Sequence, residues 1–359
     1  MEKVELFLIP DITFSNPPKF REYLIENYNP AQVVHDLTII VGITKYDKND
    51  FFKALQSFGF TIVRNLGSVR HIKFDSDGGP LECYVTHDTD TGVVIFYTNY
   101  RKTREEEIPK IRDFLGSDAN TYYLFFKPIL MKEIAEELMD RYENLEITEF
   151  TARRLPNSRF ESQIRPKYER TISYWGSDGR EALQELGYQY GVLPSRFVVN
   201  IPETIKFKVD DEGLFTFAVG DLNILFEILE KAVNESRRTM DAYNGSSFKV
   251  LPVKTARRSF NIPSSTPVSI QLQEKMEFHD MKEFKNKLNK EYTIVDFIAK
   301  EGSLFLSSDV VSKSGFQFRI KADENHIRMF PADEMIFSEF MKFYEFILQS
   351  IDPIAELVV

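Results

Sequence analysis

The sequence predicts an α+β protein made of quasi-repeated hairpin–helix modules, whose antiparallel sheets carry helices on one face. Three observations lead to this fold class. Short strand-like segments come in pairs joined by acidic turns, an amphipathic segment follows each pair, and the combination occurs three times in 359 residues. Hydrophobic residues make up 43% of the chain, which is enough for a large buried core.

Each predicted module consists of two strands, a turn with acidic residues and a following helix. The three modules are 81–98 with a helix from Thr103, 205–219 with a helix from Asp221, and 316–330 with a helix from Asp333. The middle helix places apolar residues at i, i+3, i+4 and i+7, and Thr103 and Glu106 have capping-box spacing. The last helix is apolar around most of its circumference, so we expect it to be buried on several sides or to cover a partner.

The remaining elements follow from local signals. A continuous β-branched run predicts a buried strand at 37–41, and Asp47 or Asn49 is placed to cap the next helix, which Gly59 ends. The other predicted strands are 3–9, 60–65, 69–75, 145–150 and 247–253, and the other predicted helices are 17–27, 128–142 and 180–190.

A second repetition is the tetrapeptide Thr-Ala-Arg-Arg, which occurs at 151–154 and again at 255–258. Both copies follow a predicted long helix and a strand. The distance in sequence between the two copies is too long for a solenoid repeat and suggests domain duplication. Pro- and Ser-containing connections then divide the chain into an N-terminal domain (1–153), a middle domain with a basic connecting arm (154–262) and a C-terminal domain (263–359), with residues 259–268 as the second connection.

Duplicated strand–strand–helix modules with a localised basic surface resemble sliding clamps and saddle-shaped transcription-factor folds in architecture. The resemblance is one of clamp-like or saddle-like duplication. No motif of those families can be matched to this chain residue by residue, so no residue role follows from it.

Charge is distributed unevenly along the chain. The net charge is −10, which discourages non-specific contact with nucleic acid or anionic lipid. Two stretches are positively charged, unlike the chain as a whole: 151–175 has six cations against two acids, and 242–273 has four cations and no acid. One basic face that meets a polyanion would explain this asymmetry, and so would ion pairs with the abundant acids of the chain.

Aromatic residues are interleaved with the cations of both stretches, as in proteins that bind single strands. Trp175, the one tryptophan of the chain, is a candidate stacking residue, with burial in the core as the alternative. The candidate nucleic-acid-binding residues are Arg153, Arg154, Arg159, Arg165, Lys167, Arg170, Trp175, Lys254, Arg257 and Arg258.

Motifs for catalysis are not evident. The sequence has no Walker or dinucleotide-binding fingerprint, and its five histidines are scattered, so we predict no catalytic residue, no metal site and no cofactor. Cys83 alternates with apolar neighbours, which predicts a buried structural thiol. The enzyme question stays open, and a non-enzymatic protein is favoured.

Three hypotheses on function follow. The first is a non-enzymatic protein that binds DNA or RNA through the basic segments. The second is an assembly subunit that docks a protein partner, or associates with itself as an oligomer, through its Phe-rich C-terminal helix. The third is a nuclease-like enzyme with a dispersed site. No apolar run is long enough to span a membrane, and we expect a cytoplasmic protein without a membrane partner.

Overall fold

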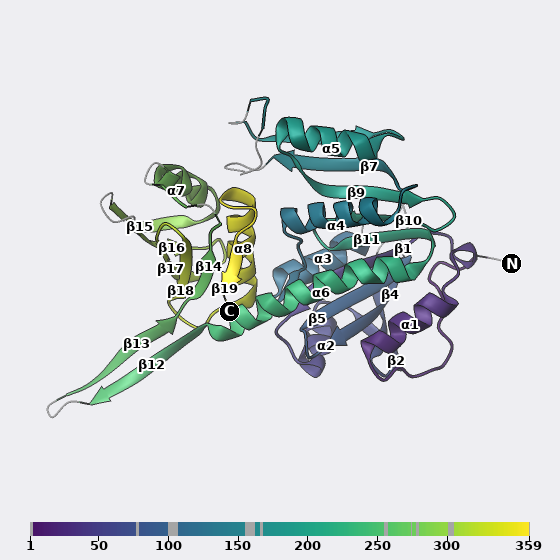
Figure 1. Ribbon diagram of the computed structural model, residues 1–359. Coiled ribbons are helices and arrows are strands. Elements are labelled where there is room, and N and C mark those ends of the chain that lie inside the picture. Colours follow the sequence, from purple (N-terminus) through teal and green to yellow (C-terminus); the bar gives the residue numbers. More distant parts are fainter. Residues whose placement is uncertain are drawn as a thin grey trace. The chain divides into compact units, whose positions relative to one another are not determined.

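The chain forms two compact units in a computed structural model (Figure 1). The N-terminal unit holds the described residues up to Arg237, and the C-terminal unit holds those from Arg238 onward. The boundary therefore falls inside helix α6 (Leu222–Gly245). The structure describes residues 3–76, 79–99, 107–154, 162–165, 168–254, 258–273, 275–277, 280–300 and 305–358.

The N-terminal unit is built on an 11-stranded antiparallel sheet of order β2-β3-β4-β5-β1-β11-β10-β9-β7-β8, with β6 paired to β1. Its strands are β1 (Leu37–Thr44), β2 (Thr61–Leu66), β3 (Val69–Ser76), β4 (Gly79–Asp88), β5 (Val93–Asn99), β6 (Thr121–Tyr123), β7 (Glu146–Arg154), β8 (Arg170–Trp175), β9 (Leu193–Ile201), β10 (Ile205–Asp210) and β11 (Leu214–Gly220). Its helices are α1 (Pro17–Asn27), α2 (Lys48–Ser57), α3 (Glu107–Ser117), α4 (Pro128–Arg141), α5 (Gly179–Tyr190) and the start of α6, with a 3-10 turn at Pro30–Gln32.

Strand β1 joins the two halves of this sheet. All eight of its residues are buried, as expected for a β-branched run in the middle of a sheet. It pairs with β5 on one side and, through Leu37–Ile40, with β11 on the other. This pairing makes one continuous sheet, so the predicted middle domain (154–262) is not a separate unit: its strands β8–β11 complete the N-terminal sheet.

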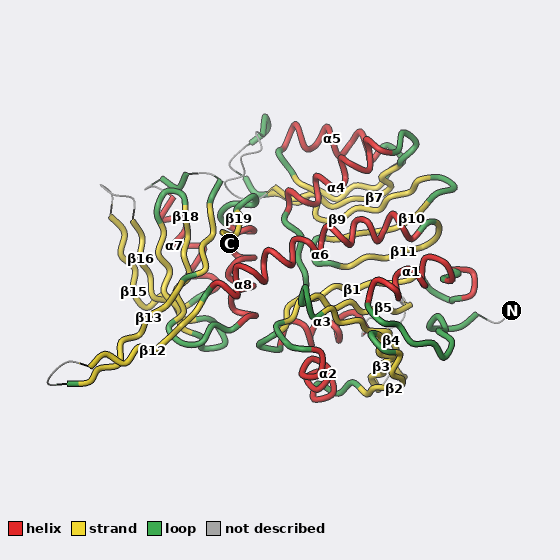
Figure 2. Tube along the Cα trace, turned by 60° about the horizontal axis from the view of Figure 1, so that its bottom comes forward, coloured by secondary structure: helices red, strands yellow, loops and turns green. Residues whose placement is uncertain are grey.

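Helices cover both faces of the first half of the sheet. Ile39 and Val41 share one core with α1, α4 and α6, while Ile40 shares another with α2 and α3. Neighbouring strand residues point to opposite faces, so β1 contributes to both cores. The view in Figure 2 shows helices on either side of the strands. The predicted placement of helices on one face therefore does not hold for this part of the N-terminal unit.

The C-terminal unit contains a six-stranded antiparallel sheet of order β15-β16-β17-β18-β14-β19 and a separate two-stranded ribbon. The sheet strands are β14 (Val268–Gln271), β15 (Thr293–Lys300), β16 (Phe305–Val311), β17 (Gln317–Ala322), β18 (His326–Pro331) and β19 (Glu356–Val358). The ribbon strands are β12 (Ser247–Lys254) and β13 (Ser259–Thr266), and the helices are α7 (Asp280–Glu291) and α8 (Phe337–Ser350).

Helix α8 forms the core of the C-terminal unit. Ten of its side chains are buried, and its aromatic rings contact Phe284 of α7, Tyr292 and Phe318 of β17. The apolar pattern therefore reflects burial on several sides, which is one of the two outcomes expected from the sequence. The other hypothesis, a docking surface on this helix, loses its basis because the apolar side chains are already covered. The last residues form β19 at the edge of the sheet.

The fold class is confirmed as α+β, and the three predicted hairpin–helix modules are present as β4-β5-α3, β10-β11-α6 and β17-β18-α8. Two segments, 37–117 and 268–350, also share a longer order of strand, helix, four strands and helix. In both, the first strand lies beside the fifth, as β2-β3-β4-β5-β1 and as β15-β16-β17-β18-β14. In the C-terminal unit, α7 and α8 lie on one face of the sheet.

Several local predictions can be compared with the structure. Asp47 caps α2, where its Oδ1 accepts the N–H groups of Asn49 (2.8 Å) and Asp50 (2.9 Å). Cys83 is buried, as predicted. Thr103 and Glu106 lie outside the described residues. Helix α8 begins at Phe337 rather than at Asp333, and residues 3–9 form no strand beyond an isolated bridge from Val4 to Val33.

The second predicted connection, 259–268, is the clearest error of local structure. Residues 259–266 form strand β13, because each of them is paired with a residue of β12. No helix in the described part of the chain is long and apolar enough to cross a membrane.

Candidate nucleic-acid interface

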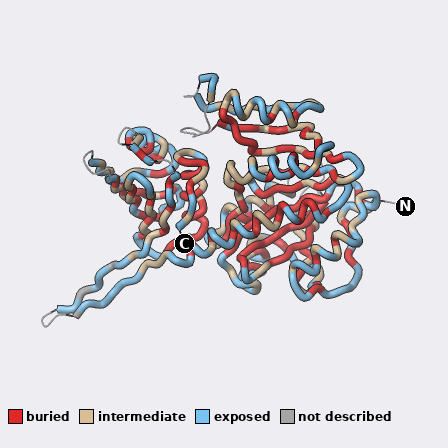
Figure 3. The backbone as a smooth tube through the Cα atoms, viewed as in Figure 1, coloured by how far each residue is buried: buried red, intermediate tan, exposed pale blue. Residues whose placement is uncertain are grey.

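The ribbon of β12 and β13, residues 247–266, is separate from both larger sheets, and we call it the arm. Its strands pair from Ser247 opposite Thr266 to Lys254 opposite Ser259. Figure 1 shows the arm extending away from the rest of the C-terminal unit, and Figure 3 shows it exposed along most of its length. An isolated two-stranded hairpin is only marginally stable in water, so this shape suits an element that contacts a partner.

Aliphatic side chains are exposed on the arm. Leu251 and Ile262 are directly opposite each other and therefore on one face, and each is 47% exposed. Val253, two residues along the same face, is 37% exposed, and Val250 on the other face is 52% exposed. The arm thus presents apolar surface on both faces, as binding surfaces do.

Basic residues give the arm its charge. Lys249, Lys254 and Arg258 lie on it, and residues 242–273 contain no acid. Lys249 and Arg258 are exposed. Arg257, together with Thr255 and Ala256, lies outside the described residues. A protruding element with cations and no acids attracts a polyanion, whatever the net charge of the rest of the protein.

Two prolines protect the edges of the arm from other strands. Both arm strands are edge strands, and Pro252 and Pro263 are placed opposite Asn261 and Val250. A proline has no N–H to offer a neighbouring strand, and it is tolerated in sheets where that group would face outward. The arm is therefore poorly suited to pairing with a strand of another molecule through its backbone. We expect its side chains to make the contacts with a partner.

The face of the C-terminal sheet opposite α7 and α8 carries basic residues among its exposed side chains. Phe318 and Ile320 of β17 are buried, whereas the alternating residues Arg319 and Lys321 point to this open face. Arg319 donates two hydrogen bonds to Asp309, from Nε to Oδ1 (2.6 Å) and from Nη2 to Oδ2 (2.8 Å). These bonds lower the pKa of Asp309 and raise that of Arg319, so both stay charged.

The first Thr-Ala-Arg-Arg copy lies in β7 of the N-terminal unit, and its two arginines differ. Arg153 is exposed, with Nη1 3.8 Å from Oδ2 of Asp211. Arg154 is only 7% exposed, and its Nη1 donates to the carbonyl oxygens of Tyr190 (3.2 Å) and Gly191 (3.4 Å). Arg154 therefore holds the end of α5 and is removed from the candidate nucleic-acid-binding residues.

The other predicted residues of the 151–175 stretch also have varied surroundings. Arg170 donates from Nη2 to the carbonyl oxygens of Ile164 (3.1 Å) and Arg165 (3.0 Å), and its guanidinium lies 4.7 Å from the ring centroid of Tyr190. It therefore shapes the loop before β8. Arg165 is exposed, with a φ of 51°. Trp175 ends the edge strand β8 and is 69% exposed, which excludes the core alternative. Arg159 and Lys167 lie outside the described residues.

The acid beside Arg153 has an unusual pKa. Burial raises the pKa of Asp211 to about 7, while the Arg153 guanidinium opposes that rise and the neighbouring Asp210 adds to it. Asp211 follows β10 in the turn to β11, so the acidic turn predicted from the sequence is partly buried. Arg153 therefore lies beside a partly buried acid of its own unit.

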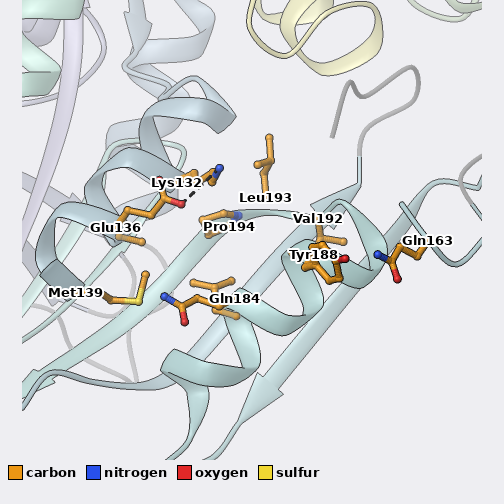
Figure 4. A pocket seen from close by; sticks show the side chains of 12 residues that line it. Lys132, Glu136, Met139, Gln163, Gln184, Tyr188, Val192, Leu193 and Pro194 are labelled. Carbon is orange, nitrogen blue, oxygen red and sulfur yellow. Dashed lines mark ion pairs between the residues drawn. The ribbon is translucent and has the colours of Figure 1, made fainter. Parts of the chain in front are cut away.

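A cavity of about 420 Å³ lies between α4, α5 and β9 (Figure 4). Apolar residues such as Met139 and Leu183 line its interior, and Gln184 and Tyr188 are among its polar groups. Lys132, the cation in its lining, lies 3.4 Å from the Glu136 carboxylate. With its cation neutralised, this cavity has little attraction for a polyanion.

Metal-ligating side chains are dispersed in the described residues, where no group of three or more His, Cys, Asp or Glu could hold a metal ion. His71 and His87 are buried. His71 Nε2 lies 3.0 Å from Glu82, and His87 Nε2 lies 3.1 Å from the carbonyl oxygen of Tyr46. Both imidazoles have lowered pKa values because of burial.

Sequence reasoning missed the open face of the C-terminal sheet. The signal was present in the segment Gln317–Lys321, where polar and apolar residues alternate and the polar ones include two cations. In a sheet with one buried face, such alternation places the cations side by side on the other face. The same rule applied to β7 would have placed Arg154 inward, with Phe150 and Ala152.

Two comparisons with known proteins give matches. A family model described as "AF_0896_M: family middle domain" matches residues 129–212, which run from α4 to the end of β10 and beyond into the turn. An "Uncharacterized protein" of Archaeoglobus fulgidus is 24% identical over 358 residues, with 96% of each chain covered. This chain is therefore similar to an archaeal protein over both of its compact units, including the arm.

Proposed function

We propose that the protein binds nucleic acid without acting on it chemically, and that the arm of the C-terminal unit is the contacting element. The observation that carries the proposal is the combination found on the arm: a separate two-stranded ribbon, basic residues at Lys249, Lys254 and Arg258, exposed aliphatic side chains and no acid. The chain as a whole has a net charge of −10, and this acid-free region is one of the few that attract phosphate.

Phosphate contacts supply most of the affinity of such an interface. Each lysine or arginine that neutralises a phosphate releases condensed counterions, which favours binding at low salt. The shape of the arm is also suitable, because a two-stranded ribbon is narrow enough to enter the major groove of a duplex or to follow a single strand. Leu251, Val253 and Ile262 would contact sugars and bases while the cations hold the backbone.

The experiment is a binding titration with labelled single-stranded and duplex oligonucleotides, followed by fluorescence anisotropy. The test variant is the triple charge reversal Lys249→Glu/Lys254→Glu/Arg258→Glu. We expect it to weaken binding at least about 100-fold at moderate salt, because three attractive contacts become repulsive. Its folding should be unaffected, since no residue of the arm whose burial the structure describes belongs to the buried core.

A matched control has the same change in net charge at another place in the same unit. Lys282 and Lys290 of α7 and Lys313 are exposed, and they lie away from the arm in sequence. Lys282→Glu/Lys290→Glu/Lys313→Glu should weaken binding far less than the arm variant. If both triple variants lose the same affinity, the effect is due to net charge and not to the arm. If the arm variant loses no affinity, the proposal is overturned.

A further inference from the structure

A cleft of about 670 Å³ lies at the base of the arm. Phe248 and Ser265, which are opposite each other in β12 and β13, line it on the arm side. Outward-facing residues of the C-terminal sheet line it on the other side, among them Asp309, Arg319, Lys321 and Phe330. The cleft therefore connects the arm with the open face of the sheet inside one compact unit.

Phe330 presents an aromatic ring to this cleft. It lies in β18 between the buried residues Met329 and Pro331, so its side chain points to the open face, where it is partly exposed. Lys321 Nζ lies 5.0 Å from the centroid of the Phe330 ring. The contact is a cation–π interaction, in which the cation lies over one face of the ring. A flat ligand can take the same position if Lys321 moves toward an anion.

Arg319 adds a second flat group next to Phe330. The two residues are cross-strand neighbours in β17 and β18, and Asp309 is the neighbour of Arg319 on the other side. The paired hydrogen bonds to Asp309 engage Nε and Nη2, so the guanidinium plane is held in one orientation. A guanidinium fixed in this way can stack on a base and keeps N–H groups for base acceptors.

We infer that the cleft binds an unpaired nucleobase, so that the nucleic acid bound by this protein is single-stranded at the base of the arm. This inference rests on the proposed function and names its substrate class. The base stacks on Phe330 between the sheet and Phe248, Lys321 leaves the ring to meet the adjoining phosphate, and the strand continues along the cations of the arm. Only an unpaired base fits this description, because the faces of a paired base are covered by its neighbours in the duplex.

The experiment compares single strands of about ten nucleotides, both dT and rU, with a hairpin duplex of similar length. We expect the full-length protein to bind the single strands about 10-fold more tightly than the duplex. Phe330→Ala should weaken single-strand binding about 10-fold, the size of one lost base–aromatic stack, and leave duplex binding unchanged. Phe330→Trp should retain the affinity, since indole offers a larger stacking surface.

Phe305→Ala is the matched control. Phe305 lies on β16 and is 38% exposed, but it is not part of the cleft lining. Its removal deletes the same kind of side chain and should change single-strand affinity by less than about twofold. A thermal melt of each variant shows whether the fold is intact, and the Phe330→Trp variant provides a second test if Phe330→Ala is destabilised.

The outcomes separate the two proposals. If arm charge reversal abolishes binding but Phe330→Ala has no effect on single strands, the arm binds nucleic acid and the base site is wrong. Equal affinity for single strands and duplex would also overturn the base site. If dT and rU strands differ, the 2′-hydroxyl or the thymine methyl group is recognised as well, and the base site stands. If arm charge reversal leaves binding unchanged, the proposed function itself fails.

Discussion

The two Thr-Ala-Arg-Arg segments have identical residues, but the arginines at their fourth position, Arg154 and Arg258, have different surroundings. In the first, 151–154, the backbone belongs to β7, Arg154 is buried against the carbonyl oxygens of Tyr190 and Gly191, and Arg153 faces Asp211. In the second, 255–258, the described residue is Arg258, which lies on the arm and is exposed, and residues 242–273 contain no acid. The same residue in the same local sequence is therefore buried in one copy and exposed in the other, because its surroundings in the fold differ.

The largest expected effect comes from the same substitution made at the fourth position of each copy. Arg154→Glu should lower the free energy of unfolding of the N-terminal unit by about 3–5 kcal/mol, because it buries an acid against two carbonyl oxygens. Arg258→Glu should change the free energy of unfolding of the C-terminal unit, to which it belongs, by less than about 1 kcal/mol, since its side chain is exposed. Calorimetry of the two variants measures both shifts, and equal destabilisation would remove the distinction between the copies.

The next effect concerns the partner of Arg153. The pKa of Asp211 is raised to about 7 in the folded protein from an ordinary value near 3.8, so the folded state binds more protons than the unfolded state between these values. The Asp211 carboxyl therefore contributes most to the stability of the fold at low pH, and this contribution is lost as the pH rises toward 7. Asp211→Asn should stabilise the N-terminal unit by about 2–4 kcal/mol at pH 8 and by progressively less toward pH 4. Denaturant titrations across this range measure the gain, and a gain that does not depend on pH would contradict the assignment.

A smaller effect distinguishes apolar contacts of the arm from its charges. Leu251→Ser/Ile262→Ser removes exposed aliphatic groups from one face, so we expect nucleic-acid affinity to fall about 5-fold with an unchanged dependence on salt. Val219→Ser, at a side chain 53% exposed in the N-terminal unit, is the control and should have no effect. If the salt dependence falls together with the affinity, the serine variant has disturbed the placement of the cations.

The smallest effect is expected at Trp175, which the sequence marks as a stacking candidate in the N-terminal unit. If the arm is the contacting element, Trp175→Ala should change the dissociation constant by less than about twofold. Because Trp175 is the single tryptophan, its emission in the unaltered protein provides the same information. Strong quenching by a saturating oligonucleotide would show that the first basic stretch takes part in binding.

Much of the fold could be predicted from local patterns. The three hairpin–helix modules follow from alternation, acidic turns and helical periodicity, and each of these signals is contained within about thirty residues. The joining of β1 to β11 could not be predicted in this way, because Leu37 and Phe217 are neighbours only in the folded sheet. This long-range pair is the reason that the chain has two units rather than three domains.

The candidate site was predicted in part. The acid-free stretch 242–273 identifies the arm by composition, but Pro263 and the serines around it are typical of a connection, and the pairing with β12 is what makes them a strand. Phe330, Arg319 and Lys321 come together through the register of β17 and β18. The alternation of polar and apolar residues in these strands can be recognised in the sequence. The cleft, however, also requires the base of the arm to lie over that face, and no local sequence pattern predicts this placement.

Whether the arm contacts phosphates is tested most directly by the dependence of affinity on salt, measured for the unaltered protein and for Lys249→Gln/Lys254→Gln/Arg258→Gln. This variant removes the charges without reversing them. Each lost phosphate contact lowers the slope of log K against log salt by about one, so we expect the slope of the variant to be smaller by about two to three. An unchanged slope with unchanged affinity would show that the arm does not contact phosphates.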